Sequence, residues 1–382
     1  MKYKIKDIAQ QISVRENNPA SSSYERFVGL EHYESGEIEI SKWGSTEKLD
    51  SAMKVFEEGD ILIARRNVFL RRASIVWFEG LTSGDSIVLR AYEEKYQKLL
   101  PFVLNTEDFW NYADQNSDGT MSKRLSPKVL LEYEFDLPED KEMDKLAELL
   151  WSIYETKKQY KNVILATDEL INSRFIELFG SPVDNPMNWP TKGLMDLGNC
   201  KNGMNFSASD QGVSIQSVGV GDIKDYDILN DMDSLTTLSL NEMPKDEYLL
   251  HDGDLVFVRS NGNKSLVGRC VAIYPGKTPV TFSGFCIRFR KESEIVMLEY
   301  LLRFLKMPEI RNQMAGRGAN IQNLNQKILA ELQVPVPPMQ LQEQYVEFTQ
   351  QCNNSKVELQ NAMDSAAIMI KTLSKQSFNK EE

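Results

Sequence analysis

Residues 141–179, KEMDKLAELLWSIYETKKQYKNVILATDELINSRFIELF, decide the fold. From Met143 to Leu178 the seam positions follow one another at alternating intervals of three and four, and no proline falls between Pro138 and Pro182. This spacing predicts one long heptad helix. At about 1.5 Å per residue the helix would be roughly 55 Å long, so it needs a partner to bury its seam. The predicted seam includes Leu146, Leu150, Ile153, Ile164, Ile171 and Leu178.

A second stretch of the same kind covers residues 338–378. It follows the proline cluster Pro335, Pro337 and Pro338, and its seam positions alternate by four and three from Leu341 onward. Each helix comes after a region of similar length, which favours pairing between the two helices within one chain. A homodimeric coiled coil is the alternative for either helix alone. The predicted seam of the second helix includes Leu341, Tyr345, Phe348, Leu359, Met369 and Leu373.

The regions before the two helices mix short strand-like runs with turn clusters. EEGDILIARR and RASIVWF are such runs in the first region, and DLVFVRS and FCIRFR in the second. The predicted fold class is therefore α/β (α+β), with two similar globular domains separated by a pair of long antiparallel coiled-coil helices. The predicted segments are domain 1 at 1–140, the central helix at 141–180, a linker at 181–190, domain 2 at 191–337, the C-terminal helix at 338–378 and a tail at 379–382.

The two regions also resemble each other in sequence. Asp60 in EEGDILIARR matches Asp254 in HDGDLVFVRS, and the arginine five residues later matches as well. Further on, RLSPKVLLEYEFDLP matches NLNQKILAELQVPVP, and Leu125 aligns with Leu324. Two matched segments in the same order, each followed by a heptad helix, indicate a tandem duplication and hence an internal pseudo-two-fold repeat.

Composition narrows the class of protein. The chain has 382 residues, 41% of them hydrophobic, which supports two or three domains with real cores. It shows no run of about 18 apolar residues and no apolar leader after Met1, so a cytoplasmic location is expected. The four cysteines lack any CxxC spacing and only two histidines occur, so buried free thiols are expected and a zinc site is not.

Motifs of catalysis are missing from the sequence. There is no GxxxxGK[ST] loop, GxSxG elbow or HExxH helix. SVGVGDI at 217–223 lacks the full glycine pattern of a nucleotide loop, so a turn at a strand end is expected there. Val336 precedes Pro337-Pro338, where an amino-methyltransferase needs Asn, Asp or Ser. The sequence therefore favours a chain without catalysis of its own.

Basic residues are unevenly distributed in this acidic chain of net charge −12. No Asp or Glu occurs from 255 to 291 or from 61 to 78, yet both stretches contain several arginines. Equivalent basic stretches in both repeats predict one anionic partner met twice, and Arg and Asn are the side chains that read guanine and adenine. The alternative is that these arginines only solvate a sheet edge or pair with distant acids. The predicted DNA-binding residues are Arg65, Arg66, Asn67, Arg71, Arg72, Lys123, Arg124, Arg259, Asn261, Asn263, Lys264, Arg269, Arg317, Asn320 and Gln322.

Three segments resemble the specificity subunit of type I restriction-modification systems. GANIQNLNQKILAELQVPVPPMQLQEQ at 318–344 is similar to the family segment that leads through a PLPPLEEQ-like motif into a conserved helix. SRFIELFGSPVDNPMNWP at 173–190 looks like the family's exit from its central helix, and GDILIAR and GDLVFVR resemble its recurrent strand element. The entrance to the first helix, FDLPEDKEMDKLAEL, departs from the pattern because it has one proline and no Glu-Gln pair.

This resemblance implies a non-catalytic subunit with two target-recognition domains, each reading half of a bipartite site in double-stranded DNA. The helix pair would set the gap between the half-sites and dock two methyltransferase subunits. Those partners would bind S-adenosylmethionine and methylate adenine N6, and restriction subunits, two where present, would add ATP- and Mg²⁺-dependent cleavage. No cofactor, metal or membrane is expected for this chain itself.

Two other functions remain open from the sequence. One is a coiled-coil protein-protein scaffold without DNA specificity, whose helices pair in trans. The other is a free-standing enzyme acting on nucleic acid, which the missing catalytic motifs disfavour.

Overall fold

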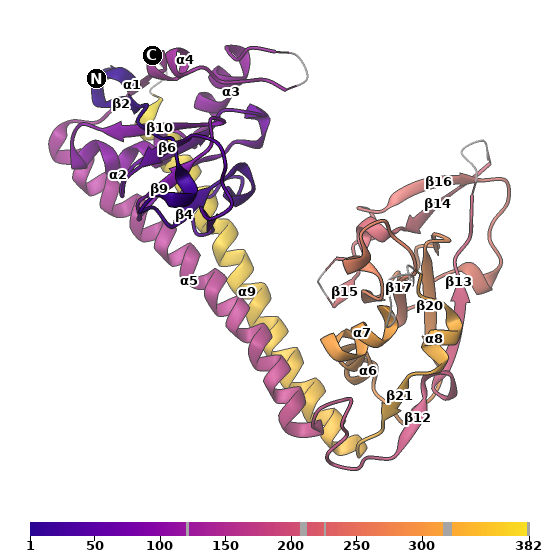
Figure 1. Ribbon diagram of the computed structural model, residues 1–382. Helices are drawn as coiled ribbons and strands as arrows, with labels where there is room; N and C mark the ends of the chain where they lie inside the picture. Colours follow the sequence, from indigo (N-terminus) through magenta and orange to yellow (C-terminus); the bar gives the residue numbers. More distant parts are fainter. Residues whose placement is uncertain (120–121, 207–211, 225–226, 316–322, 380–382) are drawn as a thin grey trace. The chain divides into compact units, whose positions relative to one another are not determined.

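The computed structural model describes residues 1–119, 122–206, 212–224, 227–315 and 323–379 (Figure 1). The chain forms two compact units. Unit 1 consists of Met1–Val163 and Glu358–Glu382, and unit 2 consists of Ile164–Val357. Each unit therefore contains one part of both long helices, which are α5 (Asp140–Phe179) and α9 (Met339–Phe378).

Unit 1 is built on an antiparallel sheet with the strand order β2-β10-β7-β8. Its strand β7 reads Ile-Leu-Ile-Ala and all four residues are buried, as expected for a central strand covered on both faces. A second sheet has the order β3-β6-β9-β4-β5, and β1 pairs with β11. The strands are β1 (Lys2–Lys4), β2 (Ala9–Ile12), β3 (Arg15–Glu16), β4 (Arg26–Val28), β5 (Gly44–Ser45), β6 (Met53–Phe56), β7 (Ile61–Ala64), β8 (Ala73–Ile75), β9 (Gly80–Thr82), β10 (Ser86–Ala91) and β11 (Glu134–Asp136).

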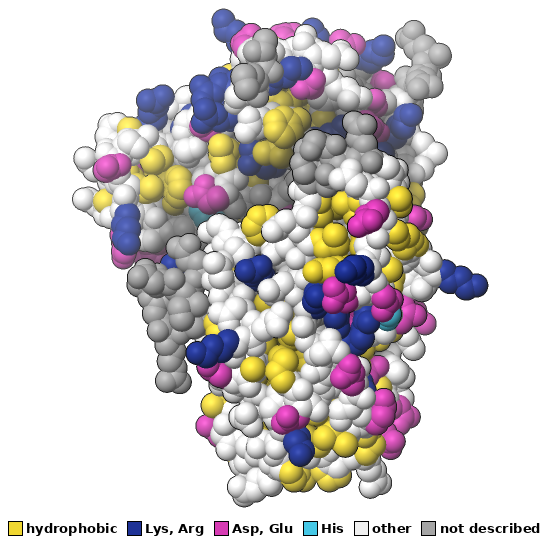
Figure 2. All heavy atoms as spheres, turned by 90° about the vertical axis from the view of Figure 1, so that its right-hand side faces the viewer, with side chains coloured by type: hydrophobic (Ala, Val, Ile, Leu, Met, Phe, Trp, Pro, Cys, Tyr) yellow, Lys and Arg dark blue, Asp and Glu magenta, His cyan; other side chains and the backbone are white. Residues whose placement is uncertain are grey.

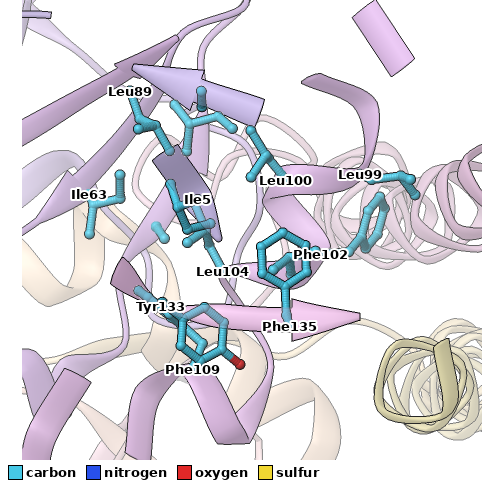
Figure 3. Close-up of a cluster of buried hydrophobic side chains, with 14 of the residues drawn as sticks. Ile5, Ile63, Leu89, Leu99, Leu100, Phe102, Leu104, Phe109, Tyr133 and Phe135 are labelled. Atoms are coloured by element: carbon cyan, nitrogen blue, oxygen red, sulfur yellow. The ribbon is translucent and has the colours of Figure 1, made fainter. Parts of the chain in front are cut away.

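The helices of unit 1 pack against one of the two buried faces of the main sheet. Side chains from the sheet, from α2 and from the segment 133–135 converge in one core (Figure 3). The same core takes in Leu150 and Tyr154 of α5 and Phe378 of α9. Each large apolar side chain buried there contributes about 1.5–3 kcal/mol before entropy is counted. The short helices are α1 (Ile5–Ile8), α2 (Glu94–Val103), α3 (Glu107–Gln115) and α4 (Pro127–Glu132), with 3-10 turns η1 (Pro19–Ser21), η2 (Leu30–His32) and η3 (Val68–Leu70).

Unit 2 repeats the same plan. Its main sheet has the order β13-β20-β17-β18-β15, a second sheet has the order β16-β14-β19, and β12 pairs with β21. The strands are β12 (Thr191–Gly193), β13 (Gly198–Asn202), β14 (Val213–Val218), β15 (Ile228–Leu229), β16 (Thr236–Leu240), β17 (Asp254–Val258), β18 (Cys270–Ile273), β19 (Val280–Phe282), β20 (Cys286–Lys291) and β21 (Gln333–Pro335). The helices are α6 (Leu298–Lys306), α7 (Pro308–Ala315) and α8 (Gln326–Ala330), with η4 (Leu194–Asp196), η5 (Val220–Asp222), η6 (Asp246–Tyr248) and η7 (Lys264–Leu266).

The predicted internal repeat is confirmed. Strands β13, β20, β17 and β18 follow one another in the sheet as β2, β10, β7 and β8 do. Leu125 donates its backbone N–H to the carbonyl of Arg65, and Leu324 donates to the carbonyl of Arg259, at 2.9 and 2.8 Å. The expected strand-end turn at 217–223 is also present, because β14 ends at Val218 and η5 follows it.

The two long helices pack against each other in antiparallel fashion. In unit 2, Phe175 of α5 stacks edge-on to Tyr345 of α9, with ring centroids 5.5 Å apart. Asp168, earlier in α5, pairs with Lys356, later in α9, at 2.6 Å. Helix α5 ends where Gly180 adopts a φ of +79° and donates its N–H to Ile176 at 2.8 Å, which is the left-handed ending that glycine favours.

The predicted seam is partly corrected. Leu150, Ile171 and Tyr345 are buried, and the other predicted positions except one are half-buried. Met369 was predicted wrongly, because its side chain is 54% exposed while Ala366 is buried. A straight helix turns every 3.6 residues, so a strict heptad drifts by about 20° per repeat along the surface. The bounds of the predicted domains stay a prediction.

Other predicted features concern cysteines and membranes. Cys270 and Cys286 are buried free thiols, and Cys200 and Cys352 are half-buried ones. In the described ranges, no three His, Cys, Asp or Glu residues are grouped so that they could hold a metal ion. A search of the same residues found no helix with the length and apolar character needed to cross a membrane.

Candidate nucleic-acid interface

A buried ion pair fixes the central strands of each unit. Asp60, 1% exposed, accepts two hydrogen bonds from Arg90 Nε and Nη2, at 2.7 and 2.8 Å. Asp254, also 1% exposed, accepts the same two bonds from Arg290, both at 2.8 Å. The hydrogen bonds to aspartate raise the pKa of both guanidiniums. The aspartate of the GD motif therefore anchors the start of β7 and of β17. Arg65 and Arg259 follow at the opposite ends of these two strands.

In unit 1 the strand β7 leads into a basic loop. Arg65 is half-buried and donates from Nε to the carbonyl of Leu125 at 3.2 Å. Arg66 and Arg124 form a β-bridge and are about half exposed, at 48% and 47%. Both guanidiniums approach the carboxylate of Asp85, at 3.7 Å for Arg66 and 3.0 Å for Arg124. These two cations form an exposed pair whose charge one acid only partly offsets.

Other predicted readers hold the loop in place. Arg72 donates to the carbonyls of Leu30 and Arg66, both at 3.0 Å, and its burial lowers the pKa of the guanidinium. Lys123 pairs with the carboxylate of Asp114 at 2.6 Å. Asn67 accepts a hydrogen bond from Ser122, whereas Arg71 is exposed. Arg72 holds the loop through its two backbone contacts. DNA contact by any of these residues stays a prediction.

The equivalent loop of unit 2 follows β17. Arg259 is half-buried and donates from Nη1 to the carbonyl of Gly284 at 3.1 Å. Asn261 accepts from the N–H of Asn263, and Asn263 in turn accepts from the N–H of Ser265 at 3.1 Å. These amides shape the turn with their oxygens, which leaves their NH₂ groups as donors. Two further predicted residues, Lys264 and Arg269, each take part in an interaction within the protein.

Three predicted readers, Arg317, Asn320 and Gln322, lie outside the described residues. Their neighbour Asn323 is described and forms a β-bridge with Ser260, directly after Arg259. The same bridge in unit 1 joins Arg66 to Arg124.

The basic residues of the acid-free stretch 255–291 do not all have the same role. Arg288 is only 3% exposed and donates to Asn199 Oδ1 at 2.8 Å, and burial lowers its pKa. Arg290 belongs to the buried ion pair with Asp254. For these two arginines, pairing inside the protein is the correct interpretation. On the visible face in Figure 2, Lys and Arg side chains are interspersed with Asp and Glu among the described residues.

Sequence reasoning missed three residues beside the basic loops. The charge pattern of the sequence gives no signal for Asp85, whose carboxylate holds Arg66 and Arg124. Phe285 takes the equivalent place in unit 2, since its carbonyl accepts from Arg259 N as that of Asp85 accepts from Arg65 N. Its side chain is 61% exposed, and that of Phe69 in η3 is 65% exposed. An exposed aromatic residue leaves no periodic signal in a sequence, so only the structure identifies these two.

Residues 186–367 match the family model of the type I restriction modification DNA specificity domain. The putative type I restriction enzyme MjaX specificity subunit of Methanocaldococcus jannaschii is 28% identical over 178 residues, 44% of this chain and 40% of that protein. The type I restriction enzyme EcoEI specificity subunit of Escherichia coli is 24% identical over 151 residues, 37% of this chain and 25% of that protein. The chain thus spans less than half the length of these curated relatives.

Solved structures share the fold over the whole chain. A chain from work on complex assembly and conformational transition of the type I R-M system matches with a TM-score of 0.57 and 15% identity, covering 99% of this chain and 97% of that one. The type I restriction-modification S subunit from M. genitalium matches with a TM-score of 0.53 and 15% identity, covering 100% and 96%. The family model, which matches residues 186–367, and the curated relatives confirm the resemblance that the motifs indicate, to the specificity subunits of type I restriction-modification systems.

Proposed function

We propose that this chain is the sequence-specific DNA-recognition subunit of a type I restriction-modification complex. The observation that carries the proposal is that the same structural arrangement occurs in both units. In both units a buried Asp-Arg pair anchors a central strand, and an arginine-bearing loop follows at the other end of that strand. Each unit would then read one half of a bipartite site in double-stranded DNA.

The charge pattern supports local rather than global attraction to DNA. With a net charge of −12 the chain would be repelled by DNA except where cations gather. Arg66 and Arg124 provide such a place in unit 1 and remain accessible. Arginine can bind guanine with two hydrogen bonds, and each good bidentate contact is worth about 1–3 kcal/mol of discrimination. A few such residues per unit are enough to select a short half-site.

The long helices would set the gap between the half-sites and dock two methyltransferase subunits. Apolar side chains remain exposed on both helices, among them Leu165 and Leu170 on α5 and Ile368 on α9. A methyltransferase subunit docked along the helices would bury these side chains, which favours association. The large apolar side chains exposed on the described parts of these helices are Leu149, Val163, Leu165, Leu170, Ile176, Met339, Val357, Ile368 and Met369.

In this proposal the chemistry belongs to the partners. The methyltransferase subunits would bind S-adenosylmethionine and methylate adenine N6 after flipping the base. Restriction subunits, where present, would use ATP and Mg²⁺. The chain itself would act without a cofactor, in the cytoplasm.

The decisive experiment maps N6-methyladenine across the genome of cells with and without this chain. A split motif that disappears on deletion is the expected result. Replacing residues 191–337 by the matching segment of a relative should change one half of the motif and leave the other. A motif that survives deletion would refute the proposal. A scaffold without DNA specificity predicts instead a complex with partner proteins that forms without DNA and resists salt.

The arginine loops can be tested in the same cells. Arg65→Ala and Arg259→Ala should each weaken methylation at sites through one half of the motif, because each residue lies at the end of the central strand of one unit. Lys98→Ala is a matched control, since Lys98 is an exposed cation on α2 that pairs with Glu94. Unchanged methylation in both arginine variants would show that the readers lie elsewhere.

A further inference from the structure

The loop between β7 and β8 has an unusual backbone. Asn67 and Arg71, on either side of η3, have φ values of +56° and +49°. This left-handed region is unfavourable for residues with a Cβ atom, less so for Asn than for Arg. Such a conformation persists only where the surroundings impose it, and it occurs preferentially at functional sites.

Several hydrogen bonds impose it here. Asn67 donates its N–H to the carbonyl of Lys123 at 3.0 Å and accepts from Ser122 Oγ at 2.9 Å. Ser35 Oγ donates to the carbonyl of Leu70 at 2.7 Å, and the N–H of Gly36 donates to the carbonyl of Arg71 at 3.3 Å. The loop is therefore fixed to two separate segments of unit 1.

The side chains of η3 divide sharply between core and solvent. Val68 is 1% exposed and joins the hydrophobic core, whereas Phe69 beside it is 65% exposed. A single exposed phenylalanine is common on protein surfaces. Phe69, however, lies in a turn with two left-handed residues that hydrogen bonds hold in place. Exposed arginines occur close to it in sequence, at positions 66 and 71.

We propose that Phe69 is an aromatic DNA-contacting residue of unit 1, whose ring stacks at a base step of the half-site while Arg66 and Arg71 bind the flanking phosphates. This inference rests on the proposed DNA-recognition function. Every base offers a π-face, and aromatic side chains inserted at a base step partly unstack it. The rigid turn would present the ring without loss of backbone entropy on binding. The neighbouring cations favour a polyanion over an apolar protein surface as the partner.

The test uses the full chain with its methyltransferase subunits and a duplex that carries the genome-mapped site. 2-Aminopurine replaces successive bases of the half-site that unit 1 reads. Phe69→Ala should weaken specific binding on the order of 10- to 100-fold and abolish the fluorescence change at one or two adjacent positions. Tyr92→Ala is the matched control. Tyr92 is 54% exposed and follows the last residue of β10, whereas Asp85 of the basic loop precedes its first residue.

A second variant, Phe69→Leu, keeps an apolar side chain of similar size but has no aromatic ring. It distinguishes loss of the ring from loss of folding. The inference predicts that it also loses the fluorescence change while its melting temperature stays at the wild-type value. The inference is wrong if Phe69→Ala binds like Tyr92→Ala, or if Phe69→Leu retains both affinity and signal. If the wild-type complex shows no preference for the mapped duplex, it is the proposed function that fails.

Discussion

Replacing Asp254 by alanine is expected to destabilise unit 2 by about 3 kcal/mol or more. The change leaves Arg290 Nε and Nη2 without their acceptor, and it also removes the acceptor of the His251 N–H at 2.8 Å. Arg290 is 22% exposed and keeps one bond to the carbonyl of Leu249 at 3.0 Å. Water and that carbonyl soften the loss, so the lower end of the range for a broken buried pair, about 3–5 kcal/mol, is appropriate.

Unit 1 offers a comparison within the same molecule. Asp60→Ala removes the same two bonds from Arg90 and the equivalent bond from the Glu57 N–H at 2.8 Å. However, Arg90 is 31% exposed and its Nη1 remains paired with Glu57 at 2.9 Å. The guanidinium thus keeps a carboxylate partner. We expect a smaller loss in unit 1, about 2 kcal/mol.

Native-state hydrogen exchange followed by mass spectrometry separates the two effects. Amides of β17 and β20 should exchange faster in Asp254→Ala, and those of β7 and β10 in Asp60→Ala. Glu247→Ala serves as a control in unit 2, since its pair with Lys201 is a surface contact. If Asp254→Ala protects β17 as well as Glu247→Ala does, or if Asp60→Ala is the more damaging change, the argument from burial is refuted.

Three further predictions follow from single contacts. Asp85→Asn removes the acid beside Arg66 and Arg124, so non-specific DNA binding should strengthen and its log–log salt slope should steepen by about one; an unchanged slope in filter-binding titrations would contradict this. In urea unfolding, Leu150→Ala should cost about 2–5 kcal/mol and the exposed Met369→Ala less than about 0.5 kcal/mol. Burial raises the pKa of the Cys270 and Cys286 thiols to about 12, so iodoacetamide at a pH of about 8.5 should label them only after unfolding. The stability that these uncharged thiols provide is complete below their ordinary value of 9.0 and is lost as the pH rises above it.

The long helices and the duplication could be predicted from the sequence for a physical reason. A helix of 40 residues repeats its apolar period many times, so the pattern stands out from local noise. Asp60 and Asp254 mark the repeat because each fills the same buried position opposite an arginine. The sequence predicts the seam of α9 less well near its end. A period of 3.5 residues places Met369 in the seam, whereas the 3.6-residue turn of a straight helix leaves its side chain exposed.

The roles of individual arginines could not be predicted. A count of charges along the chain cannot tell Arg288, which is buried against Asn199, from an exposed cation such as Arg66. Their partners come from sequence positions far away, so only the folded sheet decides which guanidinium is satisfied. The same holds for Phe69, whose exposure results from the turn around it.

The division of the long helices has a consequence for how the chain is made. Unit 2 is one uninterrupted stretch, Ile164–Val357, whereas unit 1 combines Met1–Val163 with a segment that is synthesised after unit 2. Phe378, in that late segment, is fully buried in the first core. On the ribosome, unit 2 can therefore mature first, while the N-terminal sheet waits with part of its apolar surface uncovered. The half of the chain that is made earliest would then be the last to complete its core.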